Sequence, residues 1–253
     1  MNLQSRFWVL IFFFISGATG LIYEVVWTRL LTRVMGNTHY SIATVLTIFM
    51  AGLALGSYLG GRWIDRKKNT LLFYAALEGA IGLYCLLVPS IIESASPLFE
   101  WVYQTQTESY SKASLYRFFI CGVILLIPTS LMGATLPVLS KYVSHNRMFV
   151  GRDVGTLYSF NTFGAVFGAM SSAFIFMRIW GVLATIWFAA ALNIGIAVTI
   201  YLLFQSDVSA TSKEEPDQTN ESMESSSLGA NTIFILLAFG FSGWSALTYQ
   251  VAW

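Results

Sequence analysis

The stretch that decides the fold is SGATGLIYEVVW, residues 16–27, which ends an apolar segment that begins at Phe7. A bilayer core about 30 Å thick is crossed by about 20 residues of helix. The apolar pattern continues unbroken past the small residues SGA, where a signal peptidase would otherwise cut. We therefore expect a first membrane-spanning helix over residues 7–28 rather than a removable signal peptide.

The composition supports a membrane protein. Hydrophobic residues make up 56% of the chain and charged residues 11%, which is too little charge to cover a soluble surface. The net charge of +1 gives no indication of a nucleic-acid partner. Cys85 and Cys121 lie in apolar segments and are expected to be free thiols, and His39 and His145 are far apart. We expect no metal site and no cofactor.

Seven segments are long and apolar enough to span a membrane, and each must be a helix because lipid offers the backbone no hydrogen-bond partners. They cover residues 7–28, 40–61, 71–92, 116–140, 154–176, 181–204 and 231–253. The expected fold is an all-α, polytopic helix bundle. Most Lys and Arg residues, especially those in the short segments 62–69 and 141–153, then lie on one side. The positive-inside rule makes that side, with the N-terminus, cytoplasmic.

The opening stretch returns as SGWSALTYQVAW at residues 242–253, with six of twelve positions identical. Six helices lie between the starts of the two copies, so both have the same orientation, as in transporters built from two parallel repeats. We expect a six-helix unit over 1–204, a Ser- and Glu-rich cytoplasmic linker over 205–229, and the first helix of a second, incomplete unit over 230–253. The stop at Trp253 suggests a truncated chain.

Small residues recur at helical spacing in two of the expected spans. Residues one turn apart share a helix face, and a face without side chains lets a second helix approach closely. The predicted helix-packing residues are Gly52, Gly56, Gly60, Gly164 and Gly168. In the fourth span, Pro128 and Pro137 bracket Gly133, which predicts a kinked helix with backbone carbonyls freed to line a cavity.

Carboxylates inside apolar segments are the strongest indication of a site, because a charge in hydrocarbon costs a few kcal/mol and normally faces a cavity or a partner. Glu24 and Glu78 are such residues. They indicate a cation or proton site in a polar path between helices. Alternatively, Glu24 pairs with Arg29 or Arg117 and only stabilises the bundle. The candidate substrate-binding residues are Tyr23, Glu24, Glu78 and Asn161.

Four motifs in order carry a resemblance to a known family: SGATGLIYEVVWTRLL, FMAGLALGSYLGGRWIDR, LMGATLPVL and NTFGAVFGA. Together they resemble the membrane portion of bacterial proteins that fuse a major facilitator superfamily (MFS)-like region to a spermidine synthase-like domain. In particular, Gly61, Asp65 and Arg66 resemble the MFS motif in the turn between spans two and three, although Lys68 replaces its second Gly. The resemblance implies a conformational latch for these three residues.

The resemblance also implies polyamines as a substrate class and a cytoplasmic aminopropyltransferase-like domain as a partner. No segment here is suited to that domain, so we assign no catalytic residue and leave open whether the protein is an enzyme. The expected role is a transporter-like membrane domain in the bacterial inner membrane, in contact with the bilayer and with the remaining half of the protein. The alternative is a non-transporting membrane anchor of a polyamine aminopropyltransferase.

Overall fold

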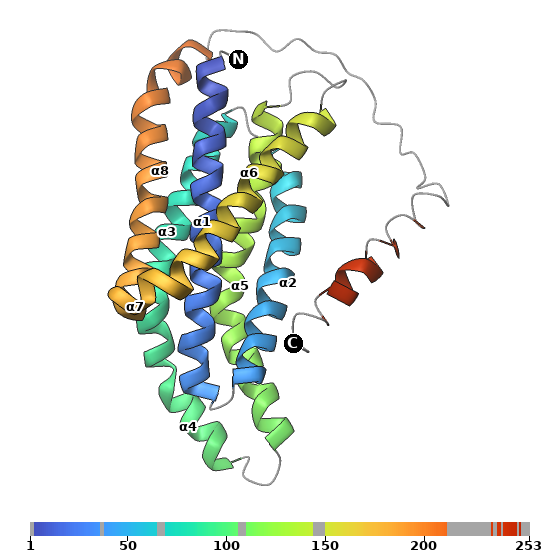
Figure 1. Ribbon diagram of the computed structural model, residues 1–253, viewed down its shortest axis with the longest axis vertical. Coiled ribbons are helices and arrows are strands. Elements are labelled where there is room, and N and C mark those ends of the chain that lie inside the picture. Colours follow the sequence, from blue (N-terminus) through green and yellow to red (C-terminus); the bar gives the residue numbers. More distant parts are fainter. Residues whose placement is uncertain are drawn as a thin grey trace. The chain divides into compact units, whose positions relative to one another are not determined.

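The computed structural model describes residues 3–35, 38–64, 69–105, 110–143 and 150–211, together with 234, 237–238, 240–246 and 248. These residues form helices and contain no strand (Figure 1). The chain divides into two units, Met1–Val208 and Ser209–Trp253. The all-α fold is confirmed.

The described residues of the first unit form eight α-helices and one π-helical turn. The helices are α1 (Leu3–Met35), α2 (Thr38–Ile64), α3 (Thr70–Ser94), α4 (Ser96–Thr105), α5 (Tyr110–Val143), α6 (Val150–Ser171), the π-helix η2 (Ser172–Phe176), α7 (Met177–Ile179) and α8 (Gly181–Thr211). Among the described residues, six helical segments are long and apolar enough to cross a bilayer: Arg6–Met35, His39–Ile64, Thr70–Ser94, Lys112–Val143, Val150–Ile179 and Gly181–Leu203. They match the first six predicted spans and are longer at most ends. The molecule is therefore a multi-pass membrane helix bundle.

The second unit contains the predicted seventh span. Its described residues are helical, with a continuous stretch at 240–246. The rest of the predicted span, including Gln250, lies outside the described residues, as does most of the predicted linker. The start of that linker is helical, since α8 continues to Thr211.

Two segments contain helix that the predicted spans do not cover. The polar segment 93–114 lies between two predicted spans, but it contains α4, in which Phe99 and Val102 are buried while Leu98 and Trp101 are exposed. Pro97 falls in the first turn, where a missing N–H costs nothing. The fifth span passes through η2 and α7 before the chain turns at Gly181, whose φ of 79° suits a residue without a Cβ.

An extensive contact with closely approaching backbones joins α2 to α5, and we call it the α2–α5 seam. A methyl group at Gly56 would overlap the backbone carbonyl oxygen of Ser130, and one at Gly52 would overlap the Thr129 hydroxyl. From the other side, a methyl group at Gly133 would overlap the carbonyl oxygen of Leu53. Gly60 faces Ala134 one turn further along. The two backbones therefore touch along several turns.

A second close contact joins α1 to α6, which crosses α1 diagonally in Figure 1. In this α1–α6 seam, Gly164 lies against the carbonyl of Phe14, and Gly168 lies against that of Ala18. Gly17 in turn lies against the backbone and side-chain oxygens of Asn161. Here both helices contribute a glycine face.

The prolines of α5 leave two carbonyls without their helical partners, because proline has no N–H to donate to the residue four positions earlier. For Pro128 that residue is Ile124, and the hydroxyl of Tyr84 in α3 donates to its carbonyl at 3.0 Å. For Pro137 it is Gly133, whose carbonyl accepts a bond from the Ser57 hydroxyl of α2 at 2.9 Å. Neighbouring helices thus satisfy both freed carbonyls.

Candidate binding site between two helix pairs

A cavity of about 310 Å³ lies between the α1–α6 pair and the α2–α5 pair. Its apolar lining includes Phe13, Phe49, Leu53 and Met132. Gly17, Gly20 and Gly133 also lie on its wall, where the absence of side chains leaves space. Its polar lining consists of Ser16, Ser57, Thr135, Tyr158 and Asn161. An apolar cavity with a few convergent polar groups is the usual form of a small-molecule site.

The cavity is connected to a buried carboxylate through Ser16. The Ser16 hydroxyl donates to Oε1 of Glu78 in α3 at 2.6 Å. Glu78 is fully buried and does not line the cavity itself. Because a hydroxyl also has lone pairs, the Ser16 oxygen can accept a bond from a guest while donating to Glu78.

The remaining polar atoms around Glu78 are not saturated. Its second oxygen, Oε2, is buried without a hydrogen-bond partner among the described residues. The hydroxyl of Tyr74, one turn earlier on the same face of α3, is also buried and lies close enough to interact with Glu78. Buried polar atoms without a partner are costly in a low-dielectric interior. Protonation of Glu78, or a positive charge held near it, would lower this cost.

Glu24 lies near the same cavity but not on its wall. Gly20 lines the cavity, and Glu24 is four residues further along α1, on the same face and about 6 Å away along the axis. Glu24 is half-buried, and within the described residues it makes no ion pair. The proposed pairing with Arg29 or Arg117 is not observed. Arg117 instead donates from Nη1 to the carbonyl of Met35 at 3.2 Å.

The other two candidate residues are separated from each other. Asn161 lines the cavity from α6, where its oxygens lie against Gly17. Tyr23 points elsewhere: it is fully buried in the apolar core and stacks on Trp27, with ring centroids 5.5 Å apart. The structure thus brings Asn161 and, through Ser16, Glu78 to one cavity and leaves Tyr23 out of it.

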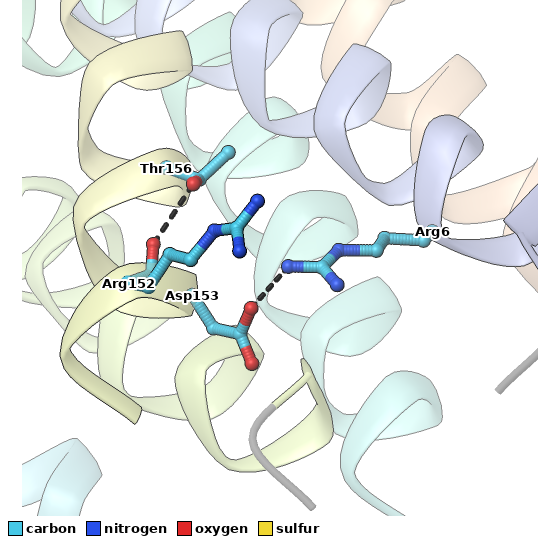
Figure 2. A network of polar contacts seen from close by, with 4 residues as sticks. All are labelled: Arg6, Arg152, Asp153 and Thr156. Atoms are coloured by element: carbon cyan, nitrogen blue, oxygen red, sulfur yellow. Dashed lines mark hydrogen bonds and ion pairs between the residues drawn. The ribbon is translucent and has the colours of Figure 1, made fainter. Parts of the chain in front are cut away.

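The predicted loop latch falls partly outside the described residues, where Asp65 and Arg66 lie. Gly61 is in an open position, where an added methyl group would have no atom within 4 Å. A different polar contact joins helix ends: Arg6 of α1 forms an ion pair with Asp153 in the first turn of α6 (Figure 2). An acidic side chain in that position is also favoured by the helix dipole.

Sequence reasoning missed four polar wall residues of the cavity: Ser16, Ser57, Thr135 and Tyr158. One signal was available for Ser16, which precedes Gly17 and lies four residues before Gly20 on one helix face. Tyr158 and Ser57 carried no comparable signal, because their positions on the wall depend on how α6 and α2 are rotated. No group of three or more His, Cys, Asp or Glu side chains forms a metal site in the part of the chain that the structure describes.

The fold and this site define a multi-pass, all-α membrane protein with a mainly apolar cavity between two helix pairs, into which a few polar groups converge. The sequence is distantly similar to two bacterial proteins named polyamine aminopropyltransferases. It is 18% identical over 189 residues to the protein from Oceanobacillus iheyensis, covering 75% of this chain and 34% of that one. It is 22% identical over 201 residues to polyamine aminopropyltransferase 1 of Streptomyces coelicolor, covering 78% of this chain and 34% of that one.

The chain thus spans about a third of the length of the curated relatives it matches. No family model matches the sequence, and no solved structure matches it.

Proposed function

We propose that this chain is a transporter-like membrane domain that binds an organic cation of the polyamine class in the cavity between the two helix pairs. The observation that carries the proposal is the bond from Ser16, on the cavity wall, to the buried carboxylate of Glu78. A carboxylate inside a membrane bundle is costly unless it serves a proton or a cation.

Polyamines suit the chemistry of this cavity. An ammonium group on the wall donates to the oxygens of Ser16 and Asn161, while Glu78 supplies the compensating negative charge through the Ser16 hydroxyl. Glu24 lies one turn away on the same face of α1 and is placed to attract a second ammonium group of an extended polyamine. The names of the two relatives support the substrate class.

The wider setting belongs to the same proposal. The domain is MFS-like and lies in the bacterial inner membrane with a cytoplasmic N-terminus, and it works with the remaining half of the protein or with a spermidine synthase-like domain. The loop residues Gly61, Asp65 and Arg66 act as a latch between helix ends. Two helix pairs that enclose one cavity support a transporter-like arrangement.

Spermidine binding and flux in liposomes test the cation site. We expect Glu78→Gln and Ser16→Ala to weaken spermidine binding about tenfold or more, because each removes part of a charge-assisted contact. Glu93→Gln is the matched control, since Glu93 lies on the same helix and is exposed. Binding that is unchanged in both site variants contradicts the proposal.

The second candidate function is a non-transporting membrane anchor of a polyamine aminopropyltransferase. It is favoured by the names of the relatives and by their additional length. The anchor predicts that wild-type liposomes neither bind nor move spermidine. It also predicts that the gene continues in frame into a Gly-rich nucleotide-binding domain, whose aminopropyl transfer is insensitive to Glu78→Gln. Spermidine flux by the wild-type chain contradicts it.

A further inference from the structure

A second cavity, of about 340 Å³, lies where α1, α4 and α5 meet, and it shares no residue with the cavity described above. It is lined by two apolar side chains and by the polar residues Arg33, Ser96, Glu100, Gln104 and Arg117. It therefore combines two cations with one anion.

Arg117 is the buried member of this set, with only 8% of its surface exposed. Its Nη1 donates to the carbonyl of Met35, the last residue of α1, but its Nε has no partner in the described part of the chain. Neither Arg117 nor Arg33 forms an ion pair with a described carboxylate. Because a buried guanidinium without an anion is costly, this arrangement favours an external anion.

The neighbouring aromatic residues indicate the depth of the cavity in the bilayer. Trp101 follows Glu100 in α4, and Tyr116 precedes Arg117 in α5. Both rings are about half exposed, and they meet edge to face with centroids 6.5 Å apart. Exposed Trp and Tyr gather at the level of the lipid headgroups. The cavity therefore opens where phospholipid phosphates lie.

We propose that this cavity binds a zwitterion that carries a phosphate and a primary ammonium group, supplied by a phosphatidylethanolamine headgroup. The phosphate lies between Arg33 and Arg117, since guanidinium groups bind phosphate oxygens in pairs. The ammonium donates to Glu100. A quaternary choline group has no N–H to donate, so phosphatidylcholine binds more weakly.

The test uses the purified full chain, stripped of lipid and then offered phosphatidylethanolamine, phosphatidylcholine, phosphatidylglycerol or free phosphoethanolamine. Bound ligand is measured by native mass spectrometry. We expect a preference of about tenfold for phosphatidylethanolamine over phosphatidylcholine, the size of one charge-assisted hydrogen bond. Tighter binding of free phosphoethanolamine than of the lipid supports the site but overturns the lipid as its source.

Substitution of the buried Arg117 could unfold the protein, so the test substitutes the exposed residues Arg33 and Glu100 instead. Arg33→Gln is expected to weaken both phosphatidylethanolamine and phosphatidylglycerol about tenfold by removing a phosphate contact. Glu100→Gln is expected to abolish only the preference of phosphatidylethanolamine over phosphatidylglycerol. Arg29→Gln is the control, since Arg29 is exposed on the same helix but does not line the cavity. Lipid binding unaffected by both Arg33→Gln and Glu100→Gln overturns the proposal.

Discussion

The two seams that enclose the first cavity both rest on glycines from both helices, but the side-chain bonds across them differ. In the α2–α5 seam, glycines bring the backbones together and the Ser57 hydroxyl bonds across to the Gly133 carbonyl that Pro137 leaves free. In the α1–α6 seam, glycines likewise bring the backbones together. Between the described residues of α1 and α6, the only side-chain bond is the Arg6–Asp153 ion pair at one end.

This difference suggests that the two seams have different mechanical properties. A side-chain bond to a freed carbonyl in the middle of a seam resists sliding, because its loss leaves a buried acceptor unpaired. The α1–α6 seam has an ion pair at one end and no side-chain bond among its described residues in the middle, so sliding there leaves no buried acceptor unpaired. We therefore expect α1 to shift against α6 more easily than α2 against α5, which would change the cavity wall at Ser16 and Asn161.

The largest effect is expected when leucine replaces a seam glycine. Gly56→Leu and Gly164→Leu both force side-chain atoms into a backbone carbonyl, at a cost of about 3 kcal/mol or more. Gly56→Leu should be the worse of the two, because separating α2 from α5 also breaks the bond from Ser57. Unfolding can be followed with a thiol-reactive dye, since Cys85 and Cys121 are buried and free.

The controls for this comparison are Gly61→Leu in α2 and Gly155→Leu in α6, where nothing lies within 4 Å of an added methyl group. Neither should lower the unfolding temperature. If Gly164→Leu destabilises the protein more than Gly56→Leu, the proposed difference between the seams is wrong.

An intermediate effect is expected from the bond to the freed carbonyl. Ser57→Ala leaves the Gly133 carbonyl unpaired and should cost about 1–3 kcal/mol. The cost should be smaller in a Pro137→Ala background, where the new N–H of residue 137 bonds to Gly133 within the helix. Additive effects of the two substitutions would contradict this explanation. Ser159→Ala, at an exposed position bonded only within its own helix, is the control.

The smallest effect is expected at the ion pair. Arg6→Gln or Asp153→Asn should each cost about 1 kcal/mol or less, because the Arg6 side chain is 39% exposed and its charge is screened by water. The loss should shrink between about 0.1 M and about 1 M salt, as the Debye length falls from about 10 Å to about 3 Å. Arg178→Gln, at an exposed position, provides the control. A loss of stability that does not depend on salt would mean that packing, not charge, stabilises this end of the α1–α6 seam.

The sequence predicted much of the fold and part of the site. Glu78 was recognisable as a site residue because a carboxylate in an apolar helix needs a partner. Pro137 was recognisable as the source of a freed carbonyl because proline inside a helix has no N–H to donate. The partners were not recognisable. Ser16 and Ser57 are ordinary small polar residues in sequence, and only the rotation of their helices brings them to Glu78 and Gly133. Tyr23, next to Glu24, turns into the core because adjacent helical residues point about 100° apart.

The sequence by itself determined that this protein crosses a membrane as helices, since the length of the apolar segments and the cost of unpaired backbone groups in lipid allow nothing else. It also determined which helix faces carry glycines at helical spacing and can therefore pack closely. Only the tertiary structure decided which of these glycine faces pack against each other. The pairing of helices depends on the packing of all the helices against one another, which no single segment determines. This pairing places the cavity between two helix pairs, with Glu78 behind the cavity wall.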